Sequence, residues 1–129
     1  MTFGKARFRN SGWELLRFCN KLGFTVIGGA DRLFKAFVEE IKPTSVLSYA
    51  SRDWSMGNLY EKLGFIKDSI TAPNYYYVVN GIRKNRFGFR KSELIKQGYD
   101  KNLGEHEIML QREFYRVYDS GQIKYYKYF

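Results

Sequence analysis

The sequence predicts an α/β (α+β) fold, in which helices pack on a mixed, partly parallel sheet. Three observations predict it. Residues 30–41 have the periodicity of an amphipathic helix, β-rich segments at 13–19 and 45–49 flank that helix, and Asn80-Gly81 lies between two further β-rich segments. Strands that alternate with helices favour parallel pairing, whereas Asn-Gly favours a tight antiparallel hairpin. A length of 129 residues, 44% of them hydrophobic, suits a single domain spanning residues 1–129.

The first helix is predicted by apolar residues that recur every three or four positions. These residues are Ala30, Leu33, Phe34, Phe37, Val38 and Ile41. Pro43 should end the helix, because proline lacks a backbone N–H and clashes with the preceding turn. Residues 45–49 are few and rich in β-formers, so they are predicted to form a short buried strand.

A second helix is predicted after this strand. Its apolar positions are Met56, Leu59, Tyr60 and Leu63. Asp53 or Ser55 can cap its start, and Gly64 stands where a left-handed residue commonly ends a helix. Before the first helix, residues 13–19 contain helix formers, but the segment is short and flanked by aromatic residues. We interpret it as a strand.

The second half of the chain is predicted to add antiparallel strands and short helices. In order, the predicted elements are a strand at 74–79, a returning strand at 83–90, a short helix capped by Ser92, a helix at 105–114, and a closing hairpin that joins 115–118 to 123–128. Asp119-Ser120-Gly121 would form the turn of that hairpin. Lys124 and Lys127 predict that the last strand lies at a sheet edge, where lysines discourage aggregation.

The charge of the chain favours anionic partners. Lysine and arginine outnumber acidic residues by 22 to 13, so the formal net charge is +9. Phosphates, coenzyme A and polyanions are the ligands that such a charge favours. Cys19 and His106 are the only residues of their types, which excludes an internal disulfide and a zinc site of Cys and His ligands; no metal is predicted. Without a signal peptide or an apolar run of about 18 residues, we expect a cytoplasmic protein with no membrane contact.

Gly28-Gly29 connects an apolar stretch to the first helix. Glycines at the start of a helix let a ligand approach the backbone N–H groups, and the helix dipole attracts a phosphate toward them. The candidate phosphate-binding amides belong to Gly28, Gly29, Ala30, Asp31 and Arg32. A tight turn without any ligand is the alternative, because paired glycines before a helix are common.

A second motif is Leu59-Tyr60-Glu61-Lys62-Leu63-Gly64-Phe65. It is similar to the Leu-Tyr-x-x-x-Gly-Phe signature in the last conserved helix of the GNAT superfamily of N-acetyltransferases. The resemblance implies that the protein binds acetyl-coenzyme A, with the amides of residues 28–32 around the pyrophosphate. It also implies that Tyr60 is the catalytic general acid toward the leaving thiolate, and that residues 13–19 form a strand that splays to admit the pantetheine arm.

The resemblance extends along nearly all 129 residues to a module common in bacteriophage proteins, where it stands alone or is attached to homing-endonuclease domains. The segments that carry it are Gly28-Gly29-Ala30-Asp31-Arg32-Leu33-Phe34, Gly57-Asn58-Leu59-Tyr60, Pro73-Asn74-Tyr75, Arg90-Lys91-Ser92-Glu93-Leu94 and Tyr115-Arg116-Val117-Tyr118-Asp119-Ser120-Gly121. It implies a phage-encoded protein that works in the cytoplasm of an infected bacterial cell.

These features predict a GNAT-like protein that binds acetyl-coenzyme A and acetylates an amine on a macromolecular target. Only residues 2–12 precede the predicted strand at 13–19, so we expect the acceptor wall to be missing, and a homodimer would restore it. Glu14 is the nearest carboxylate for a general base. We interpret it instead as a solvated surface residue.

A cluster of basic residues supports a different function. Its members are Arg83, Lys84, Arg86, Arg90 and Lys91. Aromatic segments at 75–77 and 87–89 flank the cluster, so this surface could hold a nucleic-acid backbone and stack bases. A solvated hairpin with a positive face is the simpler interpretation. In this alternative the chain is a non-catalytic module that binds nucleic acid or a host nucleoprotein complex and acts against host defence.

Overall fold

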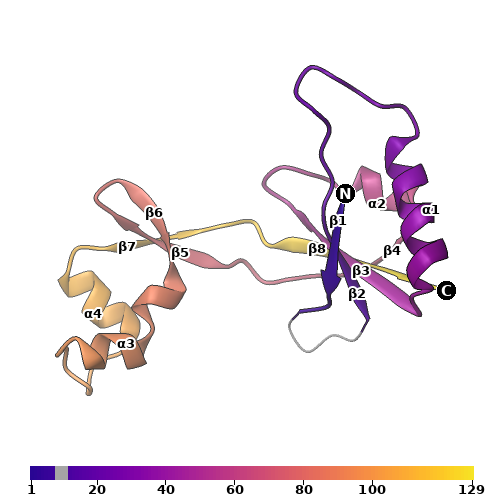
Figure 1. Ribbon diagram of the computed structural model, residues 1–129. Helices are drawn as coiled ribbons and strands as arrows, with labels where there is room; N and C mark the ends of the chain where they lie inside the picture. The colour runs from indigo at the N-terminus through magenta and orange to yellow at the C-terminus, as the bar shows by residue number, and fades with distance from the viewer. Residues whose placement is uncertain (8–11) are drawn as a thin grey trace. The chain divides into compact units, whose positions relative to one another are not determined.

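The computed structural model describes residues 1–7 and 12–129. The chain divides into two compact units (Figure 1). Unit 1 contains Met1–Ala72 and Gly121–Phe129, and unit 2 contains Pro73–Ser120. We expected one core, but the described residues form two clusters of buried apolar side chains, one in each unit. The assignment of residues 1–129 to a single domain stays a prediction.

Unit 1 is built around a mixed sheet. Its elements in the described residues are β1 (Thr2–Lys5), β2 (Trp13–Arg17), α1 (Gly29–Ile41), β3 (Ser45–Ser51), α2 (Asn58–Lys62), β4 (Ile66–Ile70) and β8 (Gln122–Tyr128). The strand order is β1-β2-β3-β8-β4, in which β2 and β3 run parallel and the other neighbours run antiparallel. The predicted fold class, a mixed and partly parallel sheet with packed helices, is confirmed.

α1 packs on this sheet through its apolar face. Phe34 is only 3% exposed, and its ring centroid lies 5.3 Å from that of Phe65. Phe37 stacks on Phe3 of β1 with 3.6 Å between ring centroids. Burial of side chains of this size stabilises the fold by roughly 2–3 kcal/mol each. This packing therefore holds the start of α1 in a defined place relative to the strands.

Unit 2 is a small antiparallel sheet covered by short helices. Its elements are β5 (Tyr75–Val79), β6 (Ile82–Asn85), a 3-10 turn η1 (Arg86–Phe89), α3 (Lys91–Lys96), α4 (Glu105–Gln111) and β7 (Tyr115–Tyr118). The strand order is β6-β5-β7. Tyr77, Leu94, Ile108 and Met109 are at most 1% exposed and form the core. Because these residues come from β5, α3 and α4, the two helices cover one face of the sheet.

The turn at Asn80-Gly81 and the end of α2 adopt the backbone conformations that the sequence predicts. Asn80 and Gly81 have φ angles of 51° and 74°, the left-handed values that a tight two-residue hairpin turn requires. Gly64 has a φ angle of 77° just after α2. The N–H of Phe65 then donates to the Tyr60 carbonyl oxygen at 2.9 Å, which closes the end of the helix.

The predicted closing hairpin between residues 115–118 and 123–128 is wrong. β7 pairs with β5 in unit 2, whereas β8 pairs with β3 and β4 in unit 1. The prediction of an edge strand is wrong for the same reason, because β8 lies between two other strands. Lys127 does not protect an edge; its ammonium group donates to the Leu63 carbonyl oxygen at 2.6 Å.

The predicted helix caps are also wrong. Gly57 and Arg90 are the N-cap residues of α2 and α3, and neither provides a side-chain hydrogen bond. Ser92 lies inside α3, and Asp53 lies several residues before α2. Ser55 instead accepts a hydrogen bond from the Gly57 N–H at 3.0 Å, which orders the turn ahead of the helix.

Two predicted elements are shorter than their sequence patterns. The returning strand predicted at 83–90 ends at Asn85, whose side chain accepts a backbone N–H two residues later and starts the 3-10 turn. The helix predicted at 105–114 ends at Gln111, because Glu113 adopts a left-handed φ angle of 60°. In both places the local backbone conformation ends the strand or helix before the end of its predicted range.

Candidate functional site

β2 and β3 separate after a short parallel pairing. Trp13 pairs with Val46 and Glu14 pairs with Leu47. Within residues 12–129, β2 and β3 form no later pair. Both strands nevertheless continue, β2 to Arg17 and β3 to its end four residues after the last pair. The two strands therefore diverge at their carboxyl ends, which is the edge of a parallel sheet where ligands commonly bind.

Ser48 bridges the point where the strands part. Its hydroxyl donates to the Leu15 carbonyl oxygen at 2.7 Å, and both residues are only 1% exposed. Beyond this point Leu16 is 45% exposed. β2 remains paired with β1 up to Arg17, while β3 remains paired with β8 along its whole length. β2 thus stays paired with β1 and β3 stays paired with β8, so the gap lies between β2 and β3.

α1 follows β2 through a long connecting segment (Figure 1). Gly28 is its N-cap residue, with a left-handed φ angle of 71° that glycine adopts without strain. The N–H of Gly29 donates to a carbonyl oxygen three residues earlier, and that of Arg32 donates to the Gly28 carbonyl oxygen. The N–H groups of Ala30 and Asp31 belong to the first turn, where a helix has no acceptor of its own. Fewer amides are therefore available to a phosphate than the sequence suggested.

The charge around this first turn is close to balanced. Asp31 places a carboxylate beside the candidate amides, and its oxygen lies 2.8 Å from the ammonium nitrogen of Lys35. A Cβ atom added to Gly28 would meet no other atom within 4 Å. The space in front of the N-cap is therefore open, and the nearby acidic charge has a cationic partner.

Tyr60 extends from α2 toward the separated strands. Its hydroxyl donates to the Tyr49 carbonyl oxygen at 3.4 Å, and Tyr49 belongs to the part of β3 that β2 no longer accompanies. The Tyr60 ring stacks on Tyr125, with 5.2 Å between centroids, and meets Phe65 edge-on at 5.9 Å. Tyr60 is thus a packed aromatic residue whose hydroxyl reaches the separation, by a hydrogen bond long enough to exchange for another partner.

Glu14 is buried, so its interpretation as a solvated residue is wrong. Only 1% of it is exposed. The Arg7 guanidinium donates to both carboxylate oxygens, with Nε 3.0 Å from Oε2, and the Arg7 backbone N–H donates to Oε2 at 3.3 Å. The hydrogen bond to Glu14 raises the pKa of the Arg7 guanidinium above its ordinary value. Because Arg7 occupies this carboxylate, Glu14 serves to anchor β2 and is not available as a general base.

We expect Arg7→Leu to lower the free energy of unfolding of unit 1 by about 2 kcal/mol. The variant leaves the buried Glu14 carboxylate without its partner. Breaking a fully buried ion pair costs more than this, but here the Arg7 side chain is 58% exposed, so the expected loss is smaller. Arg7→Leu combined with Glu14→Leu should recover part of the loss. Urea unfolding followed by tryptophan fluorescence measures both, because Trp13 and Trp54 lie in unit 1. A single variant as stable as the wild type would contradict the structural role of the pair.

Two loops next to the separated strands expose large apolar side chains. The loop after β2 exposes Leu22, Phe24, Val26 and Ile27, and the loop after β3 exposes Trp54 and Met56. Ile27 is 92% exposed and Trp54 is 89% exposed. Large exposed apolar side chains gathered in one loop are typical of interaction sites, so each loop is a candidate for contact with a partner.

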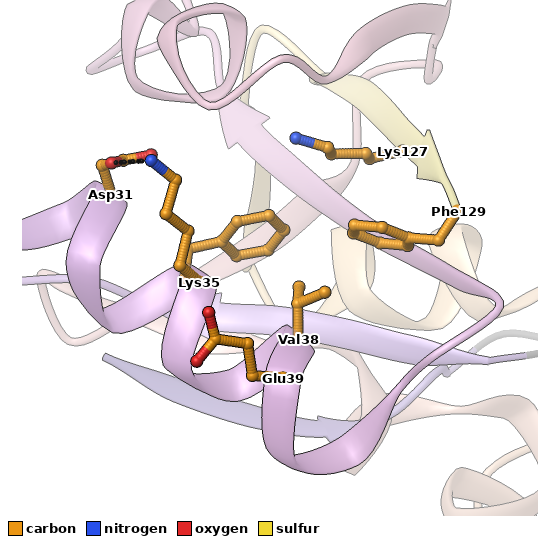
Figure 2. Close-up of a pocket in the computed structure, with 7 residues that line it drawn as sticks. Asp31, Lys35, Val38, Glu39, Lys127 and Phe129 are labelled. Carbon is orange, nitrogen blue, oxygen red and sulfur yellow. Dashed lines mark ion pairs between the residues drawn. The ribbon is translucent and has the colours of Figure 1, made fainter.

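A pocket of about 270 Å³ lies between α1 and the end of β8 (Figure 2). It is lined by Asp31, Phe34, Lys35, Val38, Glu39, Lys127 and Phe129. The rings of Phe34 and Phe129 lie 6.2 Å apart, and the Lys127 ammonium lies 5.2 Å and 5.6 Å from their centroids. Lys35 pairs with Asp31 at the rim of the pocket. With two rings and balanced charges, the pocket suits a flat, uncharged group better than a bare anion.

The predicted basic cluster lies along β6 and the segment that follows it. Its residues are Arg83, Lys84, Arg86, Arg90 and Lys91. Within the described residues, none of the five has an acidic side chain within 4.0 Å. Arg83 lies 4.4 Å from the ring centroid of Tyr76, while Arg90 and Arg86 lie 4.3 Å and 5.7 Å from that of Phe87. Arg86 also lies 4.8 Å from the ring centroid of Tyr75. The three arginines thus lie against aromatic rings, and none of the five cations has a carboxylate partner in the described part of the chain.

Arg116, in contrast, belongs to a polar network that supports unit 2. The hydroxyls of Tyr75 and Tyr77 both donate to Glu105 Oε1, at 2.8 Å and 2.9 Å. Arg116 Nε donates to the Tyr77 hydroxyl oxygen at 3.1 Å. Burial raises the pKa of Tyr77 to about 12. The network ties β5 and β7 to α4, so Arg116 is not part of the exposed basic cluster.

The structure brings together some predicted site residues and separates others. The start of α1 and Tyr60 both belong to unit 1, where Tyr60 contacts the unpaired part of β3, whereas the basic cluster belongs to unit 2. Sequence reasoning missed Arg7, Lys127 and Phe129. Their partners lie on other elements, and no local pattern in the sequence marks such contacts.

Comparison with known proteins adds no relatives to this description. No protein-family model matches the chain, and no curated protein matches it. In the part of the chain that the structure describes, no helix has both the length and the apolar character needed to cross a membrane. The resemblance to the GNAT superfamily therefore stays a prediction from the sequence, to be weighed with the geometry of the site.

Proposed function

We propose that unit 1 binds acetyl-coenzyme A at the carboxyl edge of β2 and β3 and transfers the acetyl group to an amine of a macromolecule. One observation carries this proposal. The parallel pair separates after Glu14 and Leu47, and the Tyr60 hydroxyl contacts β3 within the separated length. A gap between two strands suits a long, thin pantetheine arm, as the resemblance to GNAT acetyltransferases implies for residues 13–19.

The start of α1 supports binding of the diphosphate. The first turn directs the N–H groups of Ala30 and Asp31 outward, and the helix dipole adds attraction for an anion. The approach past Gly28 is open. Lys35 offsets the charge of the Asp31 carboxylate, which would otherwise repel a phosphate. The residues present therefore fit a diphosphate at this position.

Tyr60 supplies the acid that the proposed transfer needs. When bound, acetyl-coenzyme A would provide an activated thioester. As the amine nitrogen forms its bond to the acyl carbon and the C–S bond breaks, the phenol gives its proton to the sulfur, so that a neutral thiol leaves. The amine loses a proton to water, and the phenolate recovers one from solvent. Phenols suit this step because they hold their proton at neutral pH yet donate to a forming thiolate.

The proposed acceptor is a macromolecule, because exposed apolar loops border the gap. Side chains such as Trp54 and Ile27 would be costly to leave uncovered next to a site that served only small polar amines. We propose a protein of the infected bacterial cytoplasm, free or in a nucleoprotein complex, as the target of this phage-encoded chain. A homodimer would cover the same loops, and light scattering of the purified protein distinguishes a dimer from a monomer.

We expect Gly28→Asp to weaken acetyl-coenzyme A binding at least tenfold relative to Gly28→Asn. Asn and Asp both tolerate the left-handed conformation and have nearly the same shape, so the pair differs only in charge. The aspartate would place a negative charge at the N-cap and repel the diphosphate. Calorimetric titration of both variants and the wild type measures the difference, and thermal melting checks that both fold.

Equal affinity of the two variants would contradict a diphosphate site at the start of α1. No binding to the wild type at millimolar acetyl-coenzyme A would overturn the proposed function itself. Titration with a thioester that lacks the nucleotide then tests the gap separately, because that ligand needs the pantetheine-binding strands and not the helix N-terminus.

A further inference from the structure

We propose that the face of the unit 2 sheet opposite α3 and α4 binds single-stranded nucleic acid. This inference concerns a different unit from the proposed acetyl-coenzyme A site and depends on none of its residues. It rests on three observations, namely the side chains that the strand register places on this face, their exposure, and the cations without acidic partners in the adjoining edge strand and the segment after it.

The register of the three strands determines which side chains share this face. Tyr77 is completely buried under the helices, so its neighbours Tyr76 and Val78 point to the opposite side. Residues paired across antiparallel strands lie on the same face. The face opposite the helices, here called the open face, is therefore formed by Tyr76, Val78, Arg83, Asn85, Tyr115 and Val117.

The open face is aromatic and carries no negative charge. Tyr115 is 60% exposed and Val117 is 42% exposed. The guanidinium of Arg83 lies over the ring of Tyr76. The acidic residues of unit 2 lie on α3, α4 and the connecting loops, not among the six residues of the open face. A ligand for this surface should therefore combine flat apolar groups with negative charge.

The adjoining edge strand and the segment after it carry five cations. β6 is the edge strand of its sheet, and all four of its residues are exposed. Of the five cations, Arg83 belongs to the open face, Lys84 pairs with Tyr77 on the opposite face, and Arg86, Arg90 and Lys91 follow the strand. None of the five has an acidic side chain within 4.0 Å in the described chain. Phe87, which is 48% exposed, lies under Arg90 and offers a second aromatic surface. Phosphates can follow these cations while bases stack on the rings.

Single strands fit this surface better than a duplex. In a duplex the bases are already stacked on one another, so exposed rings such as Tyr115 and Phe87 could not reach their faces. In a single strand the bases can turn outward and stack on aromatic side chains, and arginine adds a cation–π contribution. The combination of open rings with arginines therefore favours unstacked DNA or RNA.

The first experiment measures binding of fluorescent 12-nucleotide single strands to the full chain by anisotropy. Oligo-dT and oligo-U separate DNA from RNA, and a duplex of the same length is the third ligand. We expect Arg83→Gln combined with Arg90→Gln to weaken single-strand binding at least tenfold at 100 mM salt, by analogy with losses of phosphate contacts elsewhere. The slope of log affinity against log salt should become less steep by about 1.4, because the double variant removes two phosphate contacts and each contributes about 0.7 to the slope.

Lys67→Gln combined with Lys101→Gln is the matched control. Both lysines are exposed, neither belongs to the open face, and their removal changes the net charge by the same amount. This control should bind within about twofold of the wild type. Equal weakening of the two double variants would show that only overall charge matters, and would overturn the proposal. Gly28→Asp should bind the oligonucleotides like the wild type, which separates this proposal from the acetyl-coenzyme A site.

A second pair of variants tests stacking. Phe87→Ala and Tyr115→Ala should each weaken single-strand binding by about 5- to 160-fold, the range for loss of one base–aromatic stack, whereas Tyr115→Phe keeps the ring and should bind normally. Circular dichroism confirms that the variants fold. Undetectable binding of the wild type at 50 mM salt, or equal affinity for the duplex with no effect of the alanine variants, would each overturn the proposal.

Discussion

Tyr60→Phe should abolish most of the acetyl transfer while leaving acetyl-coenzyme A binding intact. General acid catalysis by a positioned side chain contributes about 10²- to 10⁴-fold, which corresponds to about 3–5 kcal/mol of barrier. The variant keeps the ring that stacks on Tyr125 and meets Phe65. It loses only the long hydrogen bond to the Tyr49 carbonyl oxygen. The fold should therefore be unchanged, and the loss should appear in kcat.

The measurement is transfer of labelled acetyl from acetyl-coenzyme A to total protein of a bacterial lysate, compared with calorimetric affinity for the same thioester. Tyr128→Phe is the matched control, because it removes a phenolic hydroxyl from a residue that is 71% exposed in β8. It should transfer at the wild-type rate. If Tyr60→Phe does so too, Tyr60 is a core aromatic residue and not the general acid. If the wild type binds acetyl-coenzyme A but transfers nothing, the protein is a binding module.

Gly57→Ala should destabilise unit 1 by about 3–4 kcal/mol. Gly57 has a left-handed φ angle of 88°, which costs a residue with a Cβ about 1–2 kcal/mol. A Cβ at this position would lie about 2.0 Å from the hydroxyl oxygen of Tyr125. Tyr125 is fully buried and donates to the Met56 carbonyl oxygen, so it cannot withdraw without losing packing and a hydrogen bond. Overpacking of this kind adds about 1–3 kcal/mol.

Gly28→Ala is the control that isolates the steric part. Gly28 has a similar left-handed φ angle of 71°, but a Cβ there would meet nothing within 4 Å. We expect it to cost only the conformational 1–2 kcal/mol or so. Urea unfolding monitored by tryptophan fluorescence compares the two variants in the same unit. Equal losses of unfolding free energy in the two variants would mean that only the backbone angle requires glycine at position 57, and that the contact with Tyr125 contributes nothing.

The same contact links stability to the candidate site. Tyr125 packs against Gly57 on one side and stacks on Tyr60 on the other. Burial raises its pKa above the ordinary value of tyrosine, so it remains a neutral packing residue and hydrogen-bond donor. Any variant that displaces Tyr125 should therefore also displace the Tyr60 hydroxyl. For this reason Gly57→Ala is a test of stability and not of catalysis.

Local patterns in the sequence were sufficient wherever a few neighbouring residues decide the backbone. The apolar repeat at 30–41 predicted α1, and the turn residues Asn80, Gly81 and Gly64 adopt the left-handed angles that their positions require. Helix periodicity and positive φ angles depend on contacts within about four residues. The mixed fold class followed from these elements. Tyr60 and the start of α1 were likewise predicted as site residues from local motifs, and their roles stay predictions.

Long-range pairing was beyond the reach of such patterns. The sequence pattern of residues 122–128 predicted one strand of a hairpin at an exposed sheet edge. These residues lie between β3 and β4 instead, because burial of the Tyr125 side chain stabilises the fold more there than at an edge. Glu14 read as a surface residue, because nothing in the sequence shows that Arg7 meets it. A strand's charged residues reveal their burial only when their partners are known.

What the sequence alone determined about this protein is therefore most of its helices and strands, though not β1 or β4, and the chemistry available to it. The tertiary structure decided which strands pair and where they part. The separation of β2 from β3 arises because β2 stays paired with β1, the strand before it in the sequence, while β3 stays paired with β8, the last strand of the chain. Pairing across such distances is set by the packing of the whole unit, which a local pattern does not encode.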